Sequence, residues 1–220
     1  ITSLTLGDTI IPVSSSARNL GFIFDSDLSF SKQINSVCKS CHYHIRDLRR
    51  IRHLLSPSIG ITLANSLVSS KLNYCNSLYF GISTKNLSKL QRIQNSLARA
   101  ITFTSKRQHI SPVLKDLHWL PVKERIDFKI CLLTYKSLKN HQPVYLHETL
   151  SIPSHSIFTR SSQSRALSKH VTHTNAGSRA LSVAAPKLWN LLPPSIRTAP
   201  SIPTFRSRLK THLFRQAYPP

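Results

Sequence analysis

The spacing of the apolar residues changes along the chain and divides it into segments with different expected structures. Residues 4–13 alternate apolar and polar positions around Gly7-Asp8, a pattern that predicts a β-hairpin turning at that pair. A third short strand is expected over residues 20–24. Pro12 restricts the second strand to a sheet edge or a strand end, because proline has no amide hydrogen to donate. We therefore expect a small β segment over residues 1–30.

From Ser31 onward the apolar residues recur with the period of an α-helix. Ile34, Cys41, Ile45 and Leu48 fall on one face of the first expected helix. A second helix is expected from Pro57 to about residue 74. Further helices should begin at capping or proline signals, which occur at Thr84, Ser111-Pro112, Pro121 and Ser201. The pattern predicts a mainly α fold in which a helical bundle over residues 31–150 follows the short β-hairpin.

Residues 151–182 differ in composition from the rest of the chain. They are rich in Ser, Thr, His, Arg and Lys and hold few large apolar side chains, which predicts a basic polar linker. Residues 183–220 regain apolar periodicity, and their last helix is expected to end near Ala217. Together, residues 151–220 form a basic and partly irregular C-terminal extension.

The charge balance indicates a polyanionic partner. The chain has 30 Lys and Arg against 8 Asp and Glu, a formal net charge of +22. The surplus is regional: residues 1–30 carry −2, whereas residues 31–55 carry +5, residues 56–110 carry +7 and residues 151–220 carry +10. Nucleic acid is the favoured partner, with an anionic membrane surface and a generally basic protein without a defined site as the alternatives. No apolar run is long enough to span a bilayer.

The polar face of the first helix offers the best candidate nucleic-acid site. Cations recurring on one helical face can follow a phosphate backbone and release its counterions on binding. A merely solvated face is the alternative, but such a face normally carries matching acids. The candidate binding residues on the first and third helices are Lys39, Arg46, Arg49, Arg50, His53, Arg92 and Arg99. Nearby aromatics are candidates for base stacking, although core packing is the favoured role of each: Tyr43, Tyr74, Tyr79 and Trp119.

Two other motifs could bind a metal ion or haem, but for each of them a structural role in a turn or in the core is favoured. Asp25 and Asp27 could bind a divalent cation, but few other acids exist to complete a site, so a turn is favoured. The run from Cys38 through Cys41 to His44 resembles a zinc or haem motif, yet both cysteines fall on the apolar helix face and are expected in the core. Four cysteines without disulfide-scaffold spacing favour a reducing compartment. We expect no metal site, cofactor or small-molecule substrate, and no spacing marks a nucleophile with its base.

Several stretches, in order and nearly end to end, resemble the C-terminal thumb and post-thumb region of the LINE-type (non-LTR retrotransposon) reverse transcriptases, in the jockey-like and chicken-repeat-like branch. The stretches that carry the resemblance are Arg18-Asn-Leu-Gly-Phe-Ile-Phe-Asp-Ser-Asp-Leu-Ser-Phe30, Lys71-Leu-Asn-Tyr-Cys-Asn-Ser-Leu78, Leu90-Gln-Arg-Ile-Gln-Asn-Ser-Leu-Ala-Arg99, Leu117-His-Trp-Leu-Pro-Val122, Phe128-Lys-Ile-Cys-Leu-Leu-Thr-Tyr135, Ala185-Pro-Lys-Leu-Trp-Asn-Leu-Leu-Pro193 and Phe205-Arg-Ser-Arg-Leu-Lys-Thr-His-Leu-Phe214.

The resemblance implies an RNA-directed DNA polymerase that carries out target-primed reverse transcription. It implies that Leu20 and Gly21 form a primer-grip-like element and that the helices after Ser31 act as a thumb holding RNA, DNA or an RNA–DNA hybrid. The family's Tyr/Phe-x-Asp-Asp motif is absent, so the chain alone is expected to be catalytically inactive, with Mg²⁺ belonging to the parent polymerase.

The chain also lacks methionine and opens inside an expected strand, so we expect an interior or C-terminal piece of a larger protein, acting as a ribonucleoprotein in the nucleus or cytoplasm. The alternative is a domesticated or decayed protein-interaction module that no longer binds nucleic acid.

Overall fold

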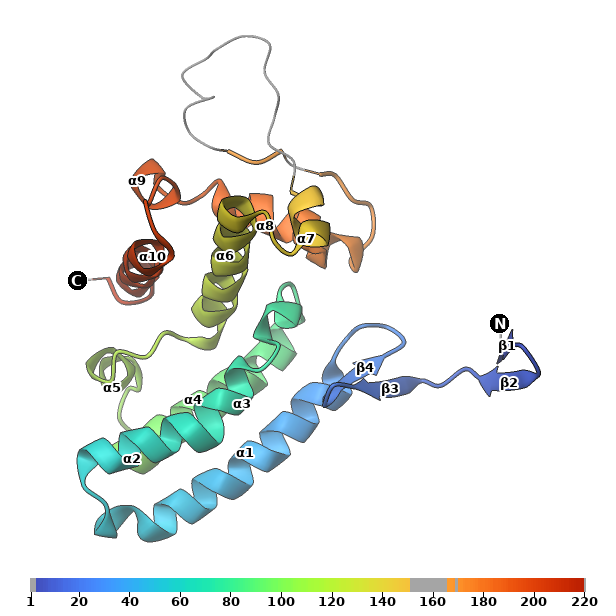
Figure 1. Cartoon of the computed structure of the whole chain (residues 1–220). Helices are drawn as coiled ribbons and strands as arrows, with labels where there is room; N and C mark the ends of the chain where they lie inside the picture. The colour runs from blue at the N-terminus through green and yellow to red at the C-terminus, as the bar shows by residue number, and fades with distance from the viewer. Residues whose placement is uncertain (1–2, 151–165, 169, 220) are drawn as a thin grey trace.

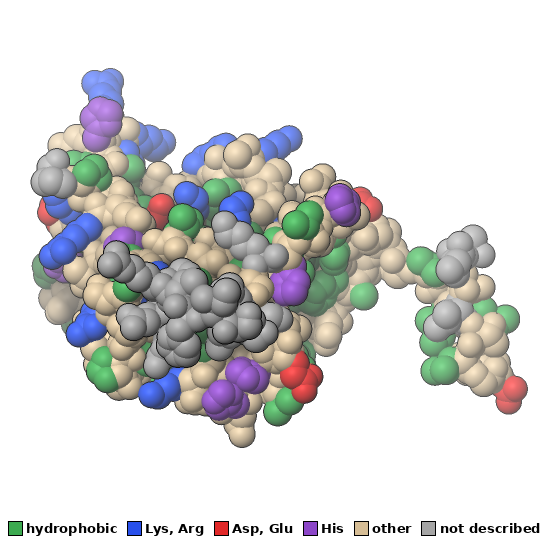
Figure 2. All heavy atoms as spheres, turned by 90° about the horizontal axis from the view of Figure 1, so that it is seen from above, with side chains coloured by type: hydrophobic (Ala, Val, Ile, Leu, Met, Phe, Trp, Pro, Cys, Tyr) green, Lys and Arg blue, Asp and Glu red, His purple; other side chains and the backbone are tan. Residues whose placement is uncertain are grey.

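The computed structural model describes residues 3–150, 166–168 and 170–219. It confirms the predicted mainly helical fold, in which a short antiparallel strand region precedes the helices (Figure 1). The first hairpin pairs β1 (Ser3–Leu6) with β2 (Thr9–Pro12) and turns at Gly7-Asp8, as predicted. Pro12 is the last residue of β2, as its missing amide hydrogen requires. This hairpin stands clear of the helices (Figures 1 and 2).

A second hairpin replaces the single strand expected over residues 20–24. Its strands are β3 (Ser16–Asn19) and β4 (Phe22–Asp25), which pair with each other and not with the first hairpin. The predicted start of the strand was wrong, because Leu20 and Gly21 form the turn with φ of 47° and 81°. Phe22 is buried against Phe30, with their ring centroids 5.3 Å apart, so β4 anchors the hairpin to the helical core.

Helix α1 (Ser31–Ile51) is amphipathic as predicted, with Ile34, Cys41, Ile45 and Leu48 buried. The 3-10 turn η1 (Arg52–Leu54) follows it. A continuous helical stretch then comprises α2 (Pro57–Ala64), a π-helical turn η2 (Asn65–Ser69) and α3 (Ser70–Asn73), close to the predicted bounds. The Ser56 hydroxyl caps α2 by accepting a hydrogen bond from the Ile59 amide at 3.4 Å.

The short 3-10 helix η3 (Asn76–Tyr79) leads to α4 (Thr84–Thr102), which packs beside α1 and runs in the same direction. Two contacts fix this direction. Lys89 Nζ donates to Asn35 Oδ1 at 2.8 Å near the start of the pair, and Arg52 Nε donates to the Ile101 carbonyl at 2.6 Å near its end. The N-cap of α4 is Ser83, one residue before the expected Thr84.

The remaining helices build a second group around α6. They are α5 (Ser111–Asp116), α6 (Val122–Asn140), α7 (Val144–Glu148), η5 (Gly177–Arg179), α8 (Leu181–Trp189), α9 (Pro194–Arg197) and α10 (Ile202–Ala217). The Tyr135 ring stacks on Phe205 at 4.1 Å and lies 6.4 Å from the ring of Trp189. Helices α8 and α10 therefore share the core of the bundle and do not form a separate extension.

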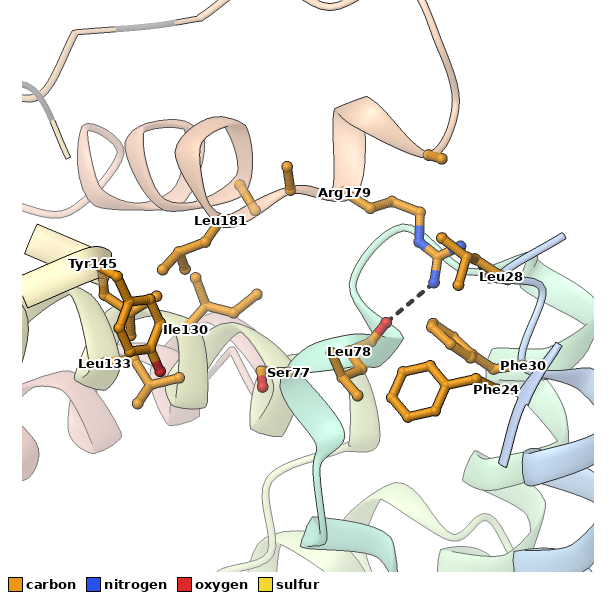
Figure 3. A pocket seen from close by; sticks show the side chains of 14 residues that line it. Phe24, Leu28, Phe30, Ser77, Leu78, Ile130, Leu133, Tyr145, Arg179 and Leu181 are labelled. Atoms are coloured by element: carbon orange, nitrogen blue, oxygen red, sulfur yellow. Dashed lines mark hydrogen bonds between the residues drawn. The ribbon is translucent and has the colours of Figure 1, made fainter. Parts of the chain in front are cut away.

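The predicted linker over residues 151–182 falls partly outside the described residues, which omit 151–165 and 169. Its later part is structured around Arg179, at the end of η5. The guanidinium donates to the carbonyls of Leu28 at 2.5 Å, Phe80 at 3.0 Å and Leu78 at 3.1 Å, and lies 4.8 Å from the centroid of the Phe30 ring. One arginine therefore joins the C-terminal segment to Phe30 and to the turn that contains Leu28, at the edge of an apolar pocket of about 530 Å³ (Figure 3).

Candidate nucleic-acid interface

The outer face of α1 carries four of the predicted cations. Three of them lie along one line on the helix surface: about two turns separate Lys39 from Arg46, and about one turn separates Arg46 from Arg50. Arg49 lies beside this line. All four side chains are exposed, whereas the opposite face of α1 is buried. We call these four residues the α1 basic face. It extends from the middle of α1 to its C-terminal end, on a helix about 30 Å long.

The residues just after α1 divide into an exposed and a buried cation. His53 is exposed in the turn η1 and continues the line of the α1 basic face. Arg52 points inward, where it donates to the carbonyls of Ile101 at 2.6 Å and Leu55 at 2.7 Å and lies over the Phe103 ring at 4.9 Å. The donors of Arg52 therefore serve the end of α4 and not a ligand.

Helix α4 brings two further cations beside the first half of α1. Arg92 is exposed, and Lys89, which the sequence analysis did not single out, lies one turn before it. Burial raises the pKa of the Cys38 thiol on α1, while the positive charges of Lys89 and Arg92 oppose that rise, so both cations lie near Cys38. The only sequence signal for Lys89 was its spacing of three residues from Arg92.

Arg99 has a different environment from the other candidates. Its side chain is half-buried, and its guanidinium donates to the carbonyls of Ser105 and of Gln108, the latter at 2.7 Å. These bonds hold the loop that follows α4. Part of the Arg99 guanidinium is therefore already hydrogen-bonded within the chain. Arg99 also lies about two turns after Arg92, near the C-terminal end of α4.

The predicted primer-grip-like pair, Leu20 and Gly21, forms the tip of the β3–β4 hairpin. The Leu20 side chain is 87% exposed, and its carbonyl accepts a hydrogen bond from the Tyr74 hydroxyl. Gly21 lines a polar hollow of about 430 Å³ between the hairpin, α1 and α3, together with Arg18 and Lys71. The hairpin tip thus lies beside the first half of α1, and Arg18 and Lys71 add two cations there.

The candidate stacking aromatics separate into two groups. Tyr79 and Trp119 are 1% and 6% exposed and belong to the core. Tyr43 is 59% exposed on α1, with the Arg46 guanidinium 4.9 Å from its ring centroid. Tyr74 is also exposed, but its hydroxyl holds the hairpin tip. Of the four, Tyr43 alone combines exposure with a place beside the α1 basic face.

Asp25 and Cys41 take structural roles. Asp25 accepts hydrogen bonds from the Ser29 hydroxyl at 2.5 Å and the Phe30 amide at 2.9 Å, closing the turn before α1. Burial tends to raise the pKa of Asp25, but these hydrogen bonds lower it below its ordinary value. Cys41 lies in the core, where burial raises its pKa to about 12. Across the described ranges, no group of three or more His, Cys, Asp or Glu side chains is placed to hold a metal ion.

The electrostatics of the whole surface favour an anionic ligand. Even if all 8 acids were paired with cations, 22 of the 30 Lys and Arg would keep an uncompensated charge. Seen from above, Lys and Arg side chains are spread over the surface and acidic ones are few (Figure 2). Near the α1 basic face, the acid within the helix is Asp47, which is half-buried. An extended anion contacting this face would therefore meet little competing negative charge.

Comparison with protein families, with curated proteins and with solved structures finds no match to this chain. Within the described residues, no helix is both long enough and apolar enough to cross a membrane.

Proposed function

We propose that this chain binds an RNA–DNA hybrid or structured RNA through its phosphate backbone. The observation that carries the proposal is the α1 basic face, where Lys39, Arg46, Arg49 and Arg50 are exposed together on one helix. Cations that contact phosphates give affinity without reading bases, so binding should depend weakly on sequence and steeply on salt. His53 and Arg92 extend the same contact, and Arg99 contributes less because its donors hold a loop.

The resemblance to LINE-type reverse transcriptases supports a more specific role for this binding. In that role the α1 basic face holds the template–primer duplex like a thumb, and Leu20 and Gly21 approach the primer strand. The two elements adjoin the same helix, which is compatible with one duplex contacting both. The proposal assigns no catalytic step to this chain. The catalytic aspartates and Mg²⁺ would belong to the parent polymerase, which would act as a ribonucleoprotein in the nucleus or cytoplasm.

Charge reversal in the α1 basic face tests the proposal. We expect the triple variant Arg46→Glu, Arg49→Glu and Arg50→Glu to lower affinity for a template–primer hybrid roughly 10- to 100-fold near 0.1 M salt. A matched control changes three exposed cations elsewhere, Lys136→Glu, Lys139→Glu and Arg215→Glu, and so alters net charge equally. Fluorescence anisotropy with a labelled hybrid measures both. Equal losses in the two variants would reject a defined interface in favour of general basicity.

A protein-interaction module is the second candidate, and the β1–β2 hairpin favours it. An isolated two-stranded hairpin is marginally stable in water, and its exposed apolar side chains include Leu6, Ile10 and Ile11, at 69%, 69% and 44% exposure. A pull-down whose captured protein survives nuclease treatment and is lost with Ile10→Lys would support this candidate. Loss of the captured protein on nuclease treatment would support nucleic-acid binding instead.

A further inference from the structure

A second basic site lies away from the α1 basic face, in a cavity of about 780 Å³ lined by α2, α3, α6 and α10. Four cations line it from two helices. Arg125 and Lys129 lie one turn apart on α6, and Arg206 and Lys210 lie one turn apart on α10, which packs against α6. No acidic side chain of the described residues lines it. We call this cavity the α6–α10 groove.

The Arg125 guanidinium is the deepest of these charges, and the partners that hold it are neutral. Its Nε donates to the Leu120 carbonyl at 2.8 Å, its Nη1 donates to Asn73 Oδ1 at 3.4 Å, and the group lies 5.9 Å from the Trp119 ring centroid. Burial lowers the pKa of Arg125 to about 10, since desolvation disfavours the charged form. Arg125 is half-buried, and the described residues that hydrogen-bond its guanidinium supply no negative charge, so an anion beside it would be favoured.

The floor of the α6–α10 groove carries polar atoms of a different kind. Ser69 and Asn76 are 5% and 4% exposed and line the cavity. The Ser69 hydroxyl and Asn76 Oδ1 have no hydrogen-bond partner among the described residues. Asn76 Oδ1 can only accept a hydrogen bond, and a phosphate dianion has no hydrogen to donate. A ligand that pairs with Asn76 Oδ1 must therefore carry a donor group in addition to its phosphate. A ligand that satisfies the groove therefore combines an anionic group with hydroxyl or amino donors.

We propose that the α6–α10 groove binds a phosphorylated nucleoside, with the phosphate between the α6 and α10 cations and the nucleoside toward Ser69 and Asn76. The cavity volume falls within the range of about 300–1,000 Å³ typical of small-ligand sites. The same chemistry has two sources, a free mononucleotide or an unpaired nucleotide of a strand. This inference does not depend on duplex binding by α1, since the two sites use different residues.

The test is isothermal titration of the full chain with adenosine 5′-monophosphate, adenosine, inorganic phosphate and a short 5′-phosphorylated oligoadenylate. We expect the monophosphate to bind, and Arg206→Gln with Lys210→Gln to weaken it about tenfold or more. These side chains are exposed on α10, so the fold should survive. The matched control, Lys139→Gln with Arg215→Gln, should leave affinity unchanged. Equal losses in the two pairs, or no binding by any of the four probes, would overturn the proposal.

The comparison among probes separates the components of the ligand. If adenosine binds as tightly as adenosine 5′-monophosphate, the proposed role of the cations is wrong. If inorganic phosphate binds as tightly as adenosine 5′-monophosphate, the proposed role of the nucleoside is wrong. On the variant with Arg46, Arg49 and Arg50 reversed, an oligoadenylate that binds much more tightly than the monophosphate identifies a strand as the source, and equal affinity identifies the free nucleotide. Reversal of Arg46, Arg49 and Arg50 should leave monophosphate binding unchanged, so failure here is distinguishable from failure of the proposed function.

A second variant tests the floor of the groove. Ser69→Ala removes a buried hydroxyl that has no hydrogen-bond partner in the part of the chain that the structure describes, so the protein should unfold at the same or a higher temperature. If the hydroxyl contacts the nucleoside, the same variant should weaken the monophosphate about threefold. Unchanged affinity would place the nucleoside away from Ser69 and contradict the proposed orientation.

Discussion

Replacing Arg179 with alanine should measurably destabilise the fold, because this side chain joins segments about 100 and 150 residues apart in sequence. The substitution removes three charge-assisted hydrogen bonds to main-chain carbonyls and a contact with the Phe30 ring. Figure 3 shows the bond to the Leu78 carbonyl and the position of Arg179 near Leu28 and Phe30. Gly81 packs against this arginine, since a Cβ added at Gly81 would lie 2.8 Å from Arg179 Cγ. The close approach shows that the anchor is packed as well as hydrogen-bonded.

The loss in the free energy of unfolding depends on how many of these hydrogen bonds water can replace in the variant. Leu28 and Leu78 are exposed, so water can hydrate their carbonyls after the substitution, whereas Phe80 is half-buried. Counting one hydrogen bond to a charged group at about 1.5–3 kcal/mol and one cation–π contact at about 0.5–1 kcal/mol gives a loss of roughly 2–4 kcal/mol. For a chain of this length, that loss lowers the Tm by roughly 4–16 °C.

Thermal unfolding followed by circular dichroism measures this change, with Arg215→Ala as the control for loss of one exposed arginine. Arg179→Lys should recover little, because one ammonium cannot reach three carbonyls with the geometry of a guanidinium. A Tm for Arg179→Ala within about 1 °C of the control would refute the anchoring role.

Two further predictions concern the core around α6. Burial raises the pKa of Asp127 to about 6, above the value of about 3.9 in an unfolded chain, so the native state holds the proton more tightly. The stability that Asp127 contributes through this raised pKa is fully present below about pH 4 and is lost as the pH rises through about 6. In urea unfolding, Asp127→Asn should therefore remove the loss of stability over this pH range. A pH dependence equal to that of the wild type would contradict the raised pKa. Tyr135→Phe should cost about 1–2 kcal/mol, because the Tyr135 hydroxyl donates to the Ala199 carbonyl at 2.7 Å in the core, and denaturation equal to wild type would show that this bond is not needed.

The helices were predictable from sequence because their signals are local. The spacing of Ile34, Cys41 and Ile45 gives the buried face of α1, and Ser56 and Ser201 cap their helices with their own hydroxyls. The β3 strand was missed because Ser16–Asn19 is polar and does not alternate, while its pairing depends on β4. Leu20 was assigned to a strand because it is apolar, yet the hairpin places it in the turn with a positive φ.

The candidate sites were predictable only where one helix supplies all the residues. Lys39, Arg46 and Arg50 share the face of α1 whatever the tertiary structure does. Arg99 and Arg52 look equivalent to them in sequence, but contacts with a loop and with the end of α4 decide their roles. The α6–α10 groove had no sequence signal, since its cations on α6 and α10 are about 80 residues apart and its floor lies on another stretch of the chain.

The salt dependence of hybrid binding tests the central claim most directly. For a phosphate-backbone contact, the logarithm of the affinity falls linearly with the logarithm of salt concentration, with a slope of about 0.7–0.9 per phosphate neutralised. Removing three contacts with Arg46→Gln, Arg49→Gln and Arg50→Gln should reduce this slope by about 2–3, and Lys136→Gln, Lys139→Gln and Arg215→Gln should leave it unchanged. A wild-type affinity that does not change with salt, or a slope that the α1 variant does not reduce, would contradict binding through the α1 basic face.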